Sequence, residues 1–492
     1  MKMLSKRSVC FGLLLCTFVF SVGTLAEPPN IVLIVADDMG WKDVGYNGSE
    51  IKTPHIDALA FSGVRLDNFY AHPTCSPTRA SLMTGQSPRR HGINHAIAKI
   101  SEGSLPLSLK LLPEYMAEAG YETVMVGKWH LGHATTAMLP MARGFEQVYG
   151  HYTGGVGYWD HVHGGGLDWH RNGDALREVG YATHLQAEEA IRLIRERDKQ
   201  RPLFLYSAFS APHLPNEAPA ETIDKYQDIE NENRRIHAAM VDELDQAIGQ
   251  IVKTLDEEGM LDNTLIWFLS DNGGLNPAAM SDGMRGLVSN LVAVFGRPLP
   301  TDILEFVRHN TEDGGSDNGP YRRGKGALYQ GGILVPAIVS WPGRLKPASV
   351  SKQITVQDVL PTLADFVGIH LDSNQQLDGG SQSLVFSGEG ISETKDFVTV
   401  SLDGNAVLRQ PWKLVLIDGE TELYNLEEDP YETLNRAMDF PEIVADLRGV
   451  IDQIPEAEAV NPPLFRSILD MDRFGGEEDR APWAEVVQQI PD

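Results

Sequence analysis

The stretch Ile31-Val32-Leu33-Ile34-Val35-Ala36-Asp37-Asp38 decides the fold class of this 492-residue chain. Its first six residues are apolar and mostly β-branched, which is typical of a strand covered on both faces of a sheet. The run stops at two adjacent carboxylates, Asp37 and Asp38. In an open α/β sheet, ligands bind beyond the carboxyl ends of the strands. The stretch therefore predicts a central strand that delivers two acids to a ligand-binding edge.

Three further apolar runs end in polar groups. They are residues 264–270 before Asp271 and Asn272, residues 203–209 before His213, and residues 123–126 before Lys128 and His130. Helical patterns lie between the runs, with apolar residues stepping by three or four over residues 240–255 and, more weakly, over 107–119. This alternation predicts an α/β fold with a doubly wound, mostly parallel sheet flanked by helices, rather than a barrel.

The pattern changes after residue 368. Short segments separated by Gly, Asp and Pro are typical of a small antiparallel sheet, and they cover residues 397–400, 406–409, 413–417 and 422–425. We therefore expect a large α/β domain over residues 27–368 and a C-terminal subdomain with its tail over residues 369–492. The acidic, proline-punctuated last forty residues are expected to form a helix and an extended tail.

The N-terminus has the order of a secretory signal peptide. Basic residues are followed by an uncharged apolar run over residues 9–22 and by small residues up to Ala26. Fourteen apolar residues are too few for a membrane-spanning helix, which needs about 20. We expect residues 1–26 to be cleaved, and the protein to be periplasmic or secreted without a membrane anchor.

The chain is strongly acidic. Removal of the signal peptide takes away three basic residues and leaves 38 Lys and Arg against 68 Asp and Glu, a formal charge of −30. Such a charge repels phosphate, and it argues against nucleic-acid or anionic-membrane partners. A small anionic substrate stays possible where cations are concentrated locally.

Cys75 is the only cysteine outside the predicted signal peptide. It cannot form an internal disulfide, so it is an inert buried residue, an intermolecular link or a reactive group. Pro77 fits the first turn of a helix, and Arg79 follows Cys75 by one turn on the same face. Because a helix N-terminus and an arginine both favour an anion, these neighbours favour the reactive alternative.

The polar groups at the strand ends suit particular roles. Asp37, Asp38, Asp271 and Asn272 are oxygen donors, which suit a hard divalent cation such as Ca²⁺ or Mg²⁺. Each pair alone would more often be a turn or a helix cap, but their recurrence at strand ends favours the metal. Further candidates are the cations Lys128 and Lys325 and the proton-transfer groups His130 and His213.

Cys75-Ser76-Pro77-Thr78-Arg79, continued by Ala80-Ser81-Leu82-Met83-Thr84-Gly85, matches the Cys-x-Pro-x-Arg signature. On this motif the chain resembles the formylglycine-dependent sulfatases of the alkaline-phosphatase-like superfamily. Other blocks of that family occur in the expected order at residues 30–40, 127–132, 211–213, 271–274, 324–336, 412–414 and 422–426. The resemblance implies an alkaline-phosphatase-like sheet with a smaller antiparallel C-terminal subdomain.

The resemblance also implies the chemistry at Cys75. A formylglycine-generating maturation enzyme would oxidise Cys75 to an aldehyde, whose gem-diol hydrate would attack the sulfur of a sulfate ester. The alcohol would leave, and the sulfated diol would expel sulfate as the aldehyde reforms.

The site residues follow from the same motifs. Ca²⁺, or alternatively Mg²⁺, would be held beside residue 75, with Asp271 placed to take the nucleophile's proton. The implied metal ligands are Asp37, Asp38, residue 75, Asp271 and Asn272. The other implied roles are stabilisation of the diol by Arg79 and Lys128, assistance to sulfate expulsion by His130, and sulfate binding and protonation of the leaving oxygen by His213 with Lys325.

The chain departs from the family pattern in three places. Gln330 stands where Glu is common and Leu334 where a basic residue is frequent, so substrate fit or local packing is in question there. The segment between Gly274 and Lys325 is longer than in many relatives, and it is expected near the catalytic edge.

Residues 150–173 are rich in aromatic residues, histidine and glycine. They could line a carbohydrate subsite, bind a transition metal through Asp160, His161 and His163, or simply pack. The block at residues 167–173 resembles one in arylsulfatase-B-like and polysaccharide-sulfatase branches, which favours a sulfated polysaccharide or oligosaccharide as substrate. The alternatives are a phosphonate or phosphate ester hydrolase of the same superfamily and a noncatalytic anion- or carbohydrate-binding protein with unmodified Cys75.

Overall fold

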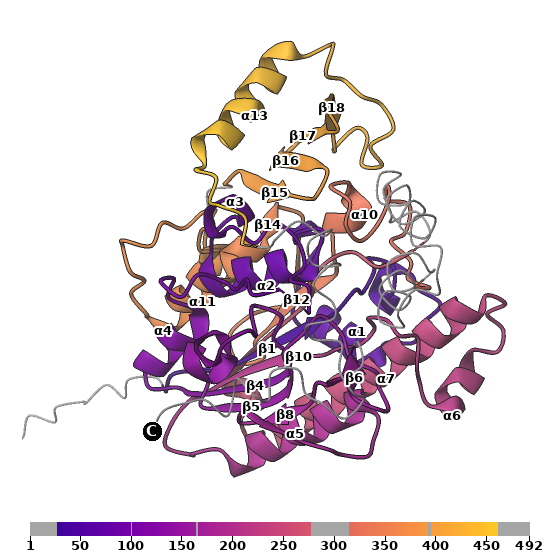
Figure 1. The fold of residues 1–492 in the computed structure, drawn as a ribbon, viewed down its shortest axis with the longest axis vertical. Coiled ribbons are helices and arrows are strands. Elements are labelled where there is room, and N and C mark those ends of the chain that lie inside the picture. Colours follow the sequence, from indigo (N-terminus) through magenta and orange to yellow (C-terminus); the bar gives the residue numbers. More distant parts are fainter. Residues whose placement is uncertain (1–26, 100, 164–165, 277–313, 392–394, 461–492) are drawn as a thin grey trace, which may run out of the picture.

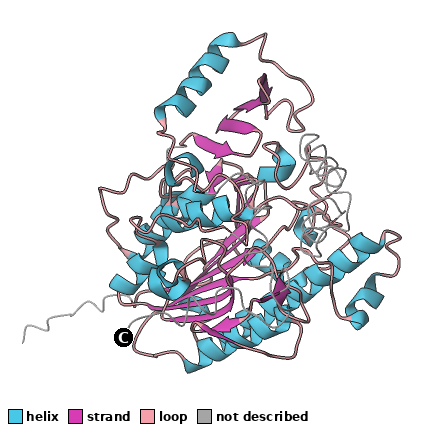
Figure 2. Cartoon of the chain, viewed as in Figure 1, coloured by secondary structure: helices cyan, strands magenta, loops and turns pink. Residues whose placement is uncertain are grey.

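The computed structural model describes residues 27–99, 101–163, 166–276, 314–391 and 395–460. A ten-stranded sheet passes through the molecule with helices on both sides (Figures 1 and 2). In spatial order its strands are β13 (Ala348–Val350), β2 (Val64–Leu66), β12 (Ala337–Ser340), β11 (Thr264–Ser270), β1 (Asn30–Ala36), β10 (Leu203–Ala208), β4 (Glu122–Lys128), β5 (Gln147–His151), β8 (His170–Arg171) and β9 (Asp174–Ala175). The central strands β11, β1, β10, β4 and β5 are parallel, so the predicted sheet is confirmed.

Strand β1 separates two apolar cores, because successive side chains of a strand point to opposite faces. Its odd-numbered residues, Ile31, Leu33 and Val35, pack with residues of α2 (Cys75–Thr84), α4 (Leu112–Glu118), α11 (Val359–Val367) and α12 (Ser383–Phe386). Its even-numbered residues, Val32, Ile34 and Ala36, pack with residues of α1 (Pro54–Ser62), α5 (Ala182–Glu196) and α7 (Glu232–Glu257). Coverage on both faces explains the unbroken apolar run in the sequence.

Two predicted helices have different N-terminal boundaries. The pattern at residues 240–255 lies within α7, which begins earlier because the side chain of Asn231 accepts the N–H of Arg234 and caps the helix. The helix predicted over residues 107–119 is wrong at its start, since α4 begins at Leu112. The carboxylate of Glu114 accepts the N–H of Leu111 at 2.7 Å, and Pro113 occupies the first turn.

A separate four-stranded antiparallel sheet follows, as predicted. It consists of β15 (Phe397–Val400), β16 (Gly404–Arg409), β17 (Trp412–Ile417) and β18 (Glu420–Asn425), paired in sequence order. One face packs against α13 (Pro441–Gln453). The other packs against residues of and before α10 (Gln330–Ile333), including Leu328 and Tyr329. Figure 1 shows α10 between the large sheet and this smaller one.

The remaining elements are short. They are α3 (Pro88–His91), α6 (Ala220–Ile223), the strand pairs β3 (Phe69–Tyr70) with β14 (Ile354–Thr355) and β6 (Val162–His163) with β7 (Gly166–Leu167), and six 3₁₀ turns at Gly45–Asn47, Thr136–Met138, Pro140–Arg143, Asp224–Tyr226, Leu261–Asn263 and Val356–Asp358. Within the ranges described, no helix has the length and apolar character needed to cross a bilayer. The predicted signal peptide, most of the segment between Gly274 and Lys325, and residues 461–492 lie outside the described residues.

Candidate active site

The pairing of β1 with β11 places the four oxygen donors together. The two strands are parallel, and Ala36 lies opposite Ser270. The next residues continue side by side: the N–H of Asp38 donates to Asp271 Oδ1 at 3.2 Å, and Nδ2 of Asn272 donates to Asp38 Oδ1 at 2.8 Å. All four side chains are buried. The expected oxygen-rich cluster is therefore formed by strand register.

Three basic side chains reach the three carboxylates from other elements. Lys128, the last residue of β4, donates to Asp37 Oδ2 at 2.6 Å, and Lys325 donates to Asp38 Oδ2 at 2.7 Å. Arg79, one turn into α2, donates through Nε and Nη2 to Asp271 Oδ2 at 2.9 and 2.7 Å. The three positive and three negative charges balance. A divalent cation would therefore leave the cluster net positive, which favours an anionic ester.

Cys75 lies at the N-terminus of α2 beside His130. Its Sγ is 3.2 Å from His130 Nδ1, and the other ring nitrogen lies 2.8 Å from the carbonyl of Ile97. A carbonyl only accepts, so Nε2 carries the hydrogen and Nδ1 presents a lone pair to position 75. Burial, aided by the charge of Lys128, holds the pKa of His130 well below its usual range, and burial also raises the pKa of the Cys75 thiol.

His213 follows β10 and completes the cluster. Its Nδ1 lies 2.7 Å from the carbonyl of Leu214, which fixes the hydrogen on Nδ1. Its Nε2 faces Asp38 Oδ2 at 3.7 Å. Burial and the nearby charge of Lys325 hold the pKa of His213 well below its usual range. The structure thus brings all ten predicted site residues into one connected group.

The carboxylates differ in their electrostatic surroundings. Burial opposes ionisation of Asp38, but the charge and hydrogen bond of Lys325, with the charge of Lys128, outweigh burial and hold its pKa below the usual range. Burial and the adjacent charge of Asp37 raise the pKa of Asp271 to about 6, although Arg79 opposes the shift. Of these two carboxyl groups, Asp271 therefore holds a proton more readily.

The donor set fits a hard divalent cation. Oδ1 of Asp37 and Oδ1 of Asn272 are buried and receive no hydrogen bond from the described residues. Buried polar atoms are normally satisfied, so two free oxygens in one cluster indicate a missing partner. Ligand atoms of Asp37, Asp38 and His213 also lie within 4.8 Å of one another. Oxygen ligands of this kind suit Ca²⁺ and Mg²⁺ alike.

The backbone is unusual at two of these residues. Asp38 has φ of 66° and His130 has φ of 58°. Positive φ is uncommon outside glycine and concentrates at functional sites. Because the chain turns at Asp38, directly after β1, the side chains of Asp37 and Asp38 point in different directions and reach different lysines.

The family model described as Sulfatase matches residues 29–369, more than half of the chain. The chain belongs to the sulfatase family. Members of this family are sulfuric ester hydrolases, and the matched span contains every predicted site residue. The large mixed sheet and the separate antiparallel sheet are those of alkaline-phosphatase-like sulfatases.

Individual sulfatases agree with this assignment. Arylsulfatase J of Mus musculus is 34% identical over 361 residues, covering 71% of this chain and 54% of that protein. The N-acetylgalactosamine-6-sulfatase of Homo sapiens is 32% identical, covering 72% of this chain and 65% of that protein. The alignments thus span between half and two thirds of these relatives. The solved structure of Ps i-CgsB in complex with k-i-k-neocarrahexaose is 27% identical, with a TM-score of 0.76, and covers 94% of this chain and 98% of that one.

The sequence did not reveal which segment covers the two histidines. A Cβ added to Gly154 would lie 2.9 Å from the His130 ring, and one added to Gly155 would lie 3.2 Å from the His213 ring. Asp168 holds this turn by accepting the N–H groups of Tyr152 and Thr153, each at 2.9 Å. In the sequence, the adjacent glycines Gly154 and Gly155 were the only sign of this close approach. They did not identify it, because glycine pairs are common in loops.

The three interpretations of residues 150–173 can now be separated. Six of the rings are buried, and they belong to His151, Tyr152, Tyr158, His161, Trp169 and His170. Packing therefore accounts for these rings, and a carbohydrate-lining role for them is wrong. The exceptions are Trp159, with half of its surface exposed, and the partly buried His163. Asp160, His161 and His163 do not form a metal-ligand group in the described structure.

The departures at Gln330 and Leu334 concern packing. Both side chains are buried, at 3% and 1% exposure. Gln330 Nε2 donates to the hydroxyl of Tyr70 at 3.3 Å, and Leu334 packs with the C-terminal sheet.

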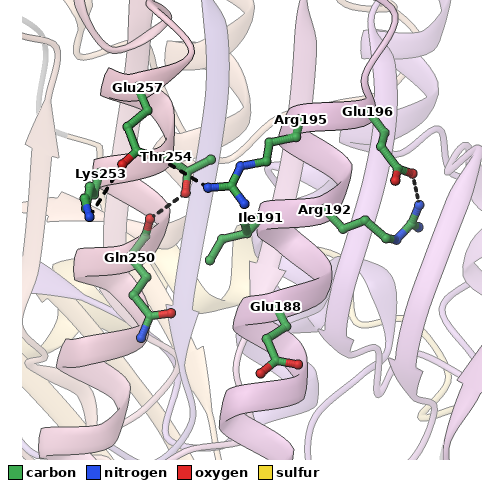
Figure 3. A pocket seen from close by; sticks show the side chains of 9 residues that line it. All are labelled: Glu188, Ile191, Arg192, Arg195, Glu196, Gln250, Lys253, Thr254 and Glu257. Atoms are coloured by element: carbon green, nitrogen blue, oxygen red, sulfur yellow. Dashed lines mark hydrogen bonds and ion pairs between the residues drawn. The ribbon is translucent and has the colours of Figure 1, made fainter.

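A polar groove of about 660 Å³ lies between α5 and α7 (Figure 3). Its charged groups pair with one another, as in Arg195 with Glu257 at 3.3 Å and Lys253 with Glu257 at 3.5 Å. None of the predicted site residues lines it. The groove is a solvated helix surface apart from the catalytic cluster.

Proposed function

We propose that this chain is an exported sulfatase that hydrolyses sulfate esters of a polysaccharide or oligosaccharide, with residue 75 in the formylglycine form and one bound Ca²⁺, or Mg²⁺. The observation that carries the proposal is the position of Cys75. It lies against His130 Nδ1, and the charges of Lys128, Lys325, Asp37 and Asp271 act on its thiol. The carbohydrate substrate is supported by the likeness to Ps i-CgsB, which was solved with a neocarrahexaose.

Formylglycine hydrate would supply the attacking oxygen, and the divalent cation would polarise the sulfuryl oxygens. Asp37, Asp38, Asp271 and Asn272 would hold the cation. Asp271 would also accept a proton from the group at position 75. Arg79 fixes Asp271 through two hydrogen bonds and thus orients that proton acceptor.

The remaining residues act on charge and on the leaving groups. Lys128 and Lys325 lie within the carboxylate cluster, where their charges would stabilise negative charge on sulfuryl oxygens. Lys325, which stays protonated, would donate a proton to the departing alcohol oxygen. His213 Nε2 faces the same space, and it would bind sulfate and share that donation once the ring gains a proton in the substrate complex. His130 Nδ1 has a free lone pair toward residue 75, so it would remove the proton whose loss expels sulfate.

The proposed location is the periplasm or the outside of the cell, and the proposed partner is a formylglycine-generating maturation enzyme. Both rest on the signal-like N-terminus and on the Cys75 motif.

The test uses protein purified from the native host. Mass spectrometry of the peptide that contains residue 75 should show the aldehyde, and the protein should desulfate an aryl sulfate and members of a panel of sulfated oligosaccharides. Full sulfatase activity with an intact thiol would overturn the formylglycine mechanism. A protein that carries the aldehyde and cleaves aryl sulfate, but none of the sulfated carbohydrates, would overturn the substrate class.

A further inference from the structure

The loop that carries Lys325 is closed at its base. The N–H of Gly331 donates to the carbonyl of Arg322 at 2.9 Å, which joins the two ends of the loop. Between them, Lys325 donates its backbone N–H to Gly274 at 3.1 Å and its ammonium to Asp38 Oδ2 at 2.7 Å. The position of the two ends therefore determines where the ammonium lies.

One end of the loop is held by a buried ion pair of the C-terminal region. Lys413 on β17 lies 2.6 Å from Glu432 Oε1, and both side chains are fully buried. The other carboxylate oxygen of Glu432 accepts the backbone N–H of Gln330 at 2.7 Å. Lys413 shares its face of β17 with Val415, which packs in the core against Tyr329. This is the face of the small sheet that Figure 1 shows toward α10.

The other end of the loop is held by the same sheet. The guanidinium of Arg322 lies 3.8 Å from the centre of the Tyr329 ring and donates to the Tyr424 hydroxyl at 2.8 Å. The hydroxyl of Tyr329 donates to Glu422 Oε2 at 2.8 Å. Two acids, one lysine and one tyrosine from the C-terminal region thus fix both sides of the loop.

Stability alone does not explain the buried pair. Replacing a buried ion pair by apolar groups of similar volume is often neutral or stabilising, because two charges no longer need to be desolvated. The pair provides something an apolar pair cannot, namely an acceptor for the N–H of Gln330. Glu432 itself has φ of 58°, so its backbone holds an unfavourable conformation to present that acceptor.

We infer that Glu432, with Lys413 as its counter-ion, is a positioning residue that sets the Lys325 ammonium against Asp38. The inference rests on the proposed function, in which Lys325 binds sulfate. It assigns a role to the blocks at residues 412–414 and 422–426, whose side chains do not reach the catalytic cluster. The C-terminal sheet is accordingly part of the active-site framework.

Two matched double variants test the inference. Lys413→Met with Glu432→Gln removes both charges but keeps an acceptor for Gln330, whereas Lys413→Met with Glu432→Met removes the acceptor as well. We expect kcat/KM for an aryl sulfate to be about tenfold or more lower in the Met/Met variant than in the Met/Gln variant. Asp446→Asn, which breaks the exposed pair with Arg409 in the same region, serves as the control with unchanged activity.

The same comparison is repeated with Lys325→Ala. If Glu432 acts through Lys325, the two double variants should then have equal kcat/KM. A third variant, Tyr424→Phe, removes the hydroxyl that accepts from Arg322 at the other end of the loop. It provides an independent test if the Met/Met variant does not fold. It should lower kcat/KM with Lys325 present and not with Lys325→Ala.

Equal activities of the folded double variants, or the same difference between them with and without Lys325, would overturn the inference alone. An unchanged kcat/KM of Tyr424→Phe in the presence of Lys325 would also overturn the inference. A wild-type protein that carries formylglycine but cleaves no sulfate ester would overturn the proposed function, and the inference with it.

Discussion

Cys75 Sγ lies 3.2 Å from His130 Nδ1, and the opposite nitrogen of the same ring is committed to the carbonyl of Ile97 at 2.8 Å. The ring is fixed further because Ser76 donates to the carbonyl of His130 at 2.9 Å. The imidazole therefore faces residue 75 as a proton acceptor. Its lowered pKa keeps it neutral near pH 7, which is the form that can accept.

His130→Ala should slow the release of sulfate more than its transfer to residue 75. In matured protein given excess aryl sulfate, we expect a burst of phenol and a sulfated enzyme visible by intact mass. The steady-state rate should fall by about 10²-fold, as for loss of a general base. Ser76→Ala, which loosens the ring without removing it, should have a smaller effect. Loss of the burst together with the steady state would assign His130 to the first step instead.

Gly154→Ala should reduce activity through His130 alone. The new Cβ would lie 2.9 Å from the imidazole, so the ring or the turn must move. Displacement of a catalytic group by a fraction of an ångström can cost about tenfold or more in kcat. Gly449→Ala is the matched control, because a Cβ there meets no atom within 4 Å and lies in helix α13. Equal activity of the two variants in thermal-melt-matched samples would contradict the packing argument.

Cation binding should depend on pH through Asp271. Its pKa of about 6 in the metal-free protein means that a cation must displace a proton below pH 6. Calorimetric titration of the Cys75→Ala protein with Ca²⁺ should show the apparent Kd weakening by about tenfold per unit below pH 6, and little change between pH 7 and 8. Asp271→Asn should bind more weakly but without this dependence. A wild-type Kd that is constant from pH 5 to 8 would contradict the assignment.

The raised pKa of Asp271 should also make the metal-free fold less stable as pH rises, whereas it makes cation binding stronger as pH rises. A carboxyl group whose folded pKa lies above its unfolded value binds more protons in the folded state, so its contribution to stability falls as pH rises from about 4 to 6. Added Ca²⁺ should reverse that trend, because it stabilises the ionised form. Melting temperatures of the wild type and of Asp271→Asn, with and without Ca²⁺, measure both effects.

The family assignment predicts a preference for sulfate over phosphonate esters. Matched aryl sulfate and aryl phosphonate monoesters both carry one negative charge, so the charge of the cluster does not separate them, and paired assays should show the higher kcat/KM for the sulfate. A large preference for the phosphonate would favour the rival hydrolase. Chelation followed by readdition of Ca²⁺ should remove and restore activity on either substrate.

The strands and their polar ends could be predicted because each is a local pattern of the chain. β1 and β11 appear in the sequence as apolar runs that stop at acids, whatever lies beside them. The site residues followed from the same ends and from the Cys75 motif. Their mutual contacts could not be predicted, because pairing partners such as Asp38 and Asn272 are separated by more than two hundred residues.

Composition was least informative in residues 150–173. Tyr158 and Trp159 are adjacent aromatic residues, yet one is fully buried and the other is half exposed. Burial depends on the long-range partners of each ring, such as the carbonyls of Ser210 and His213 that accept the Tyr158 hydroxyl. The start of α4 was missed for a related reason, since the side chain of Glu114 sets it and the apolar pattern does not.

The register of β1 against β11 should make the separation of the carboxylates in the cluster very slow. Asp37 and Asp271 leave neighbouring strands at the centre of the large sheet, so they can separate only if that sheet opens. Amide hydrogens in the middle of a sheet exchange through global rather than local opening. The N–H of Asp271, bonded to the carbonyl of Ala36, should be among the slowest to exchange. A bound cation would then dissociate without separation of the two strands whose ends hold its ligands.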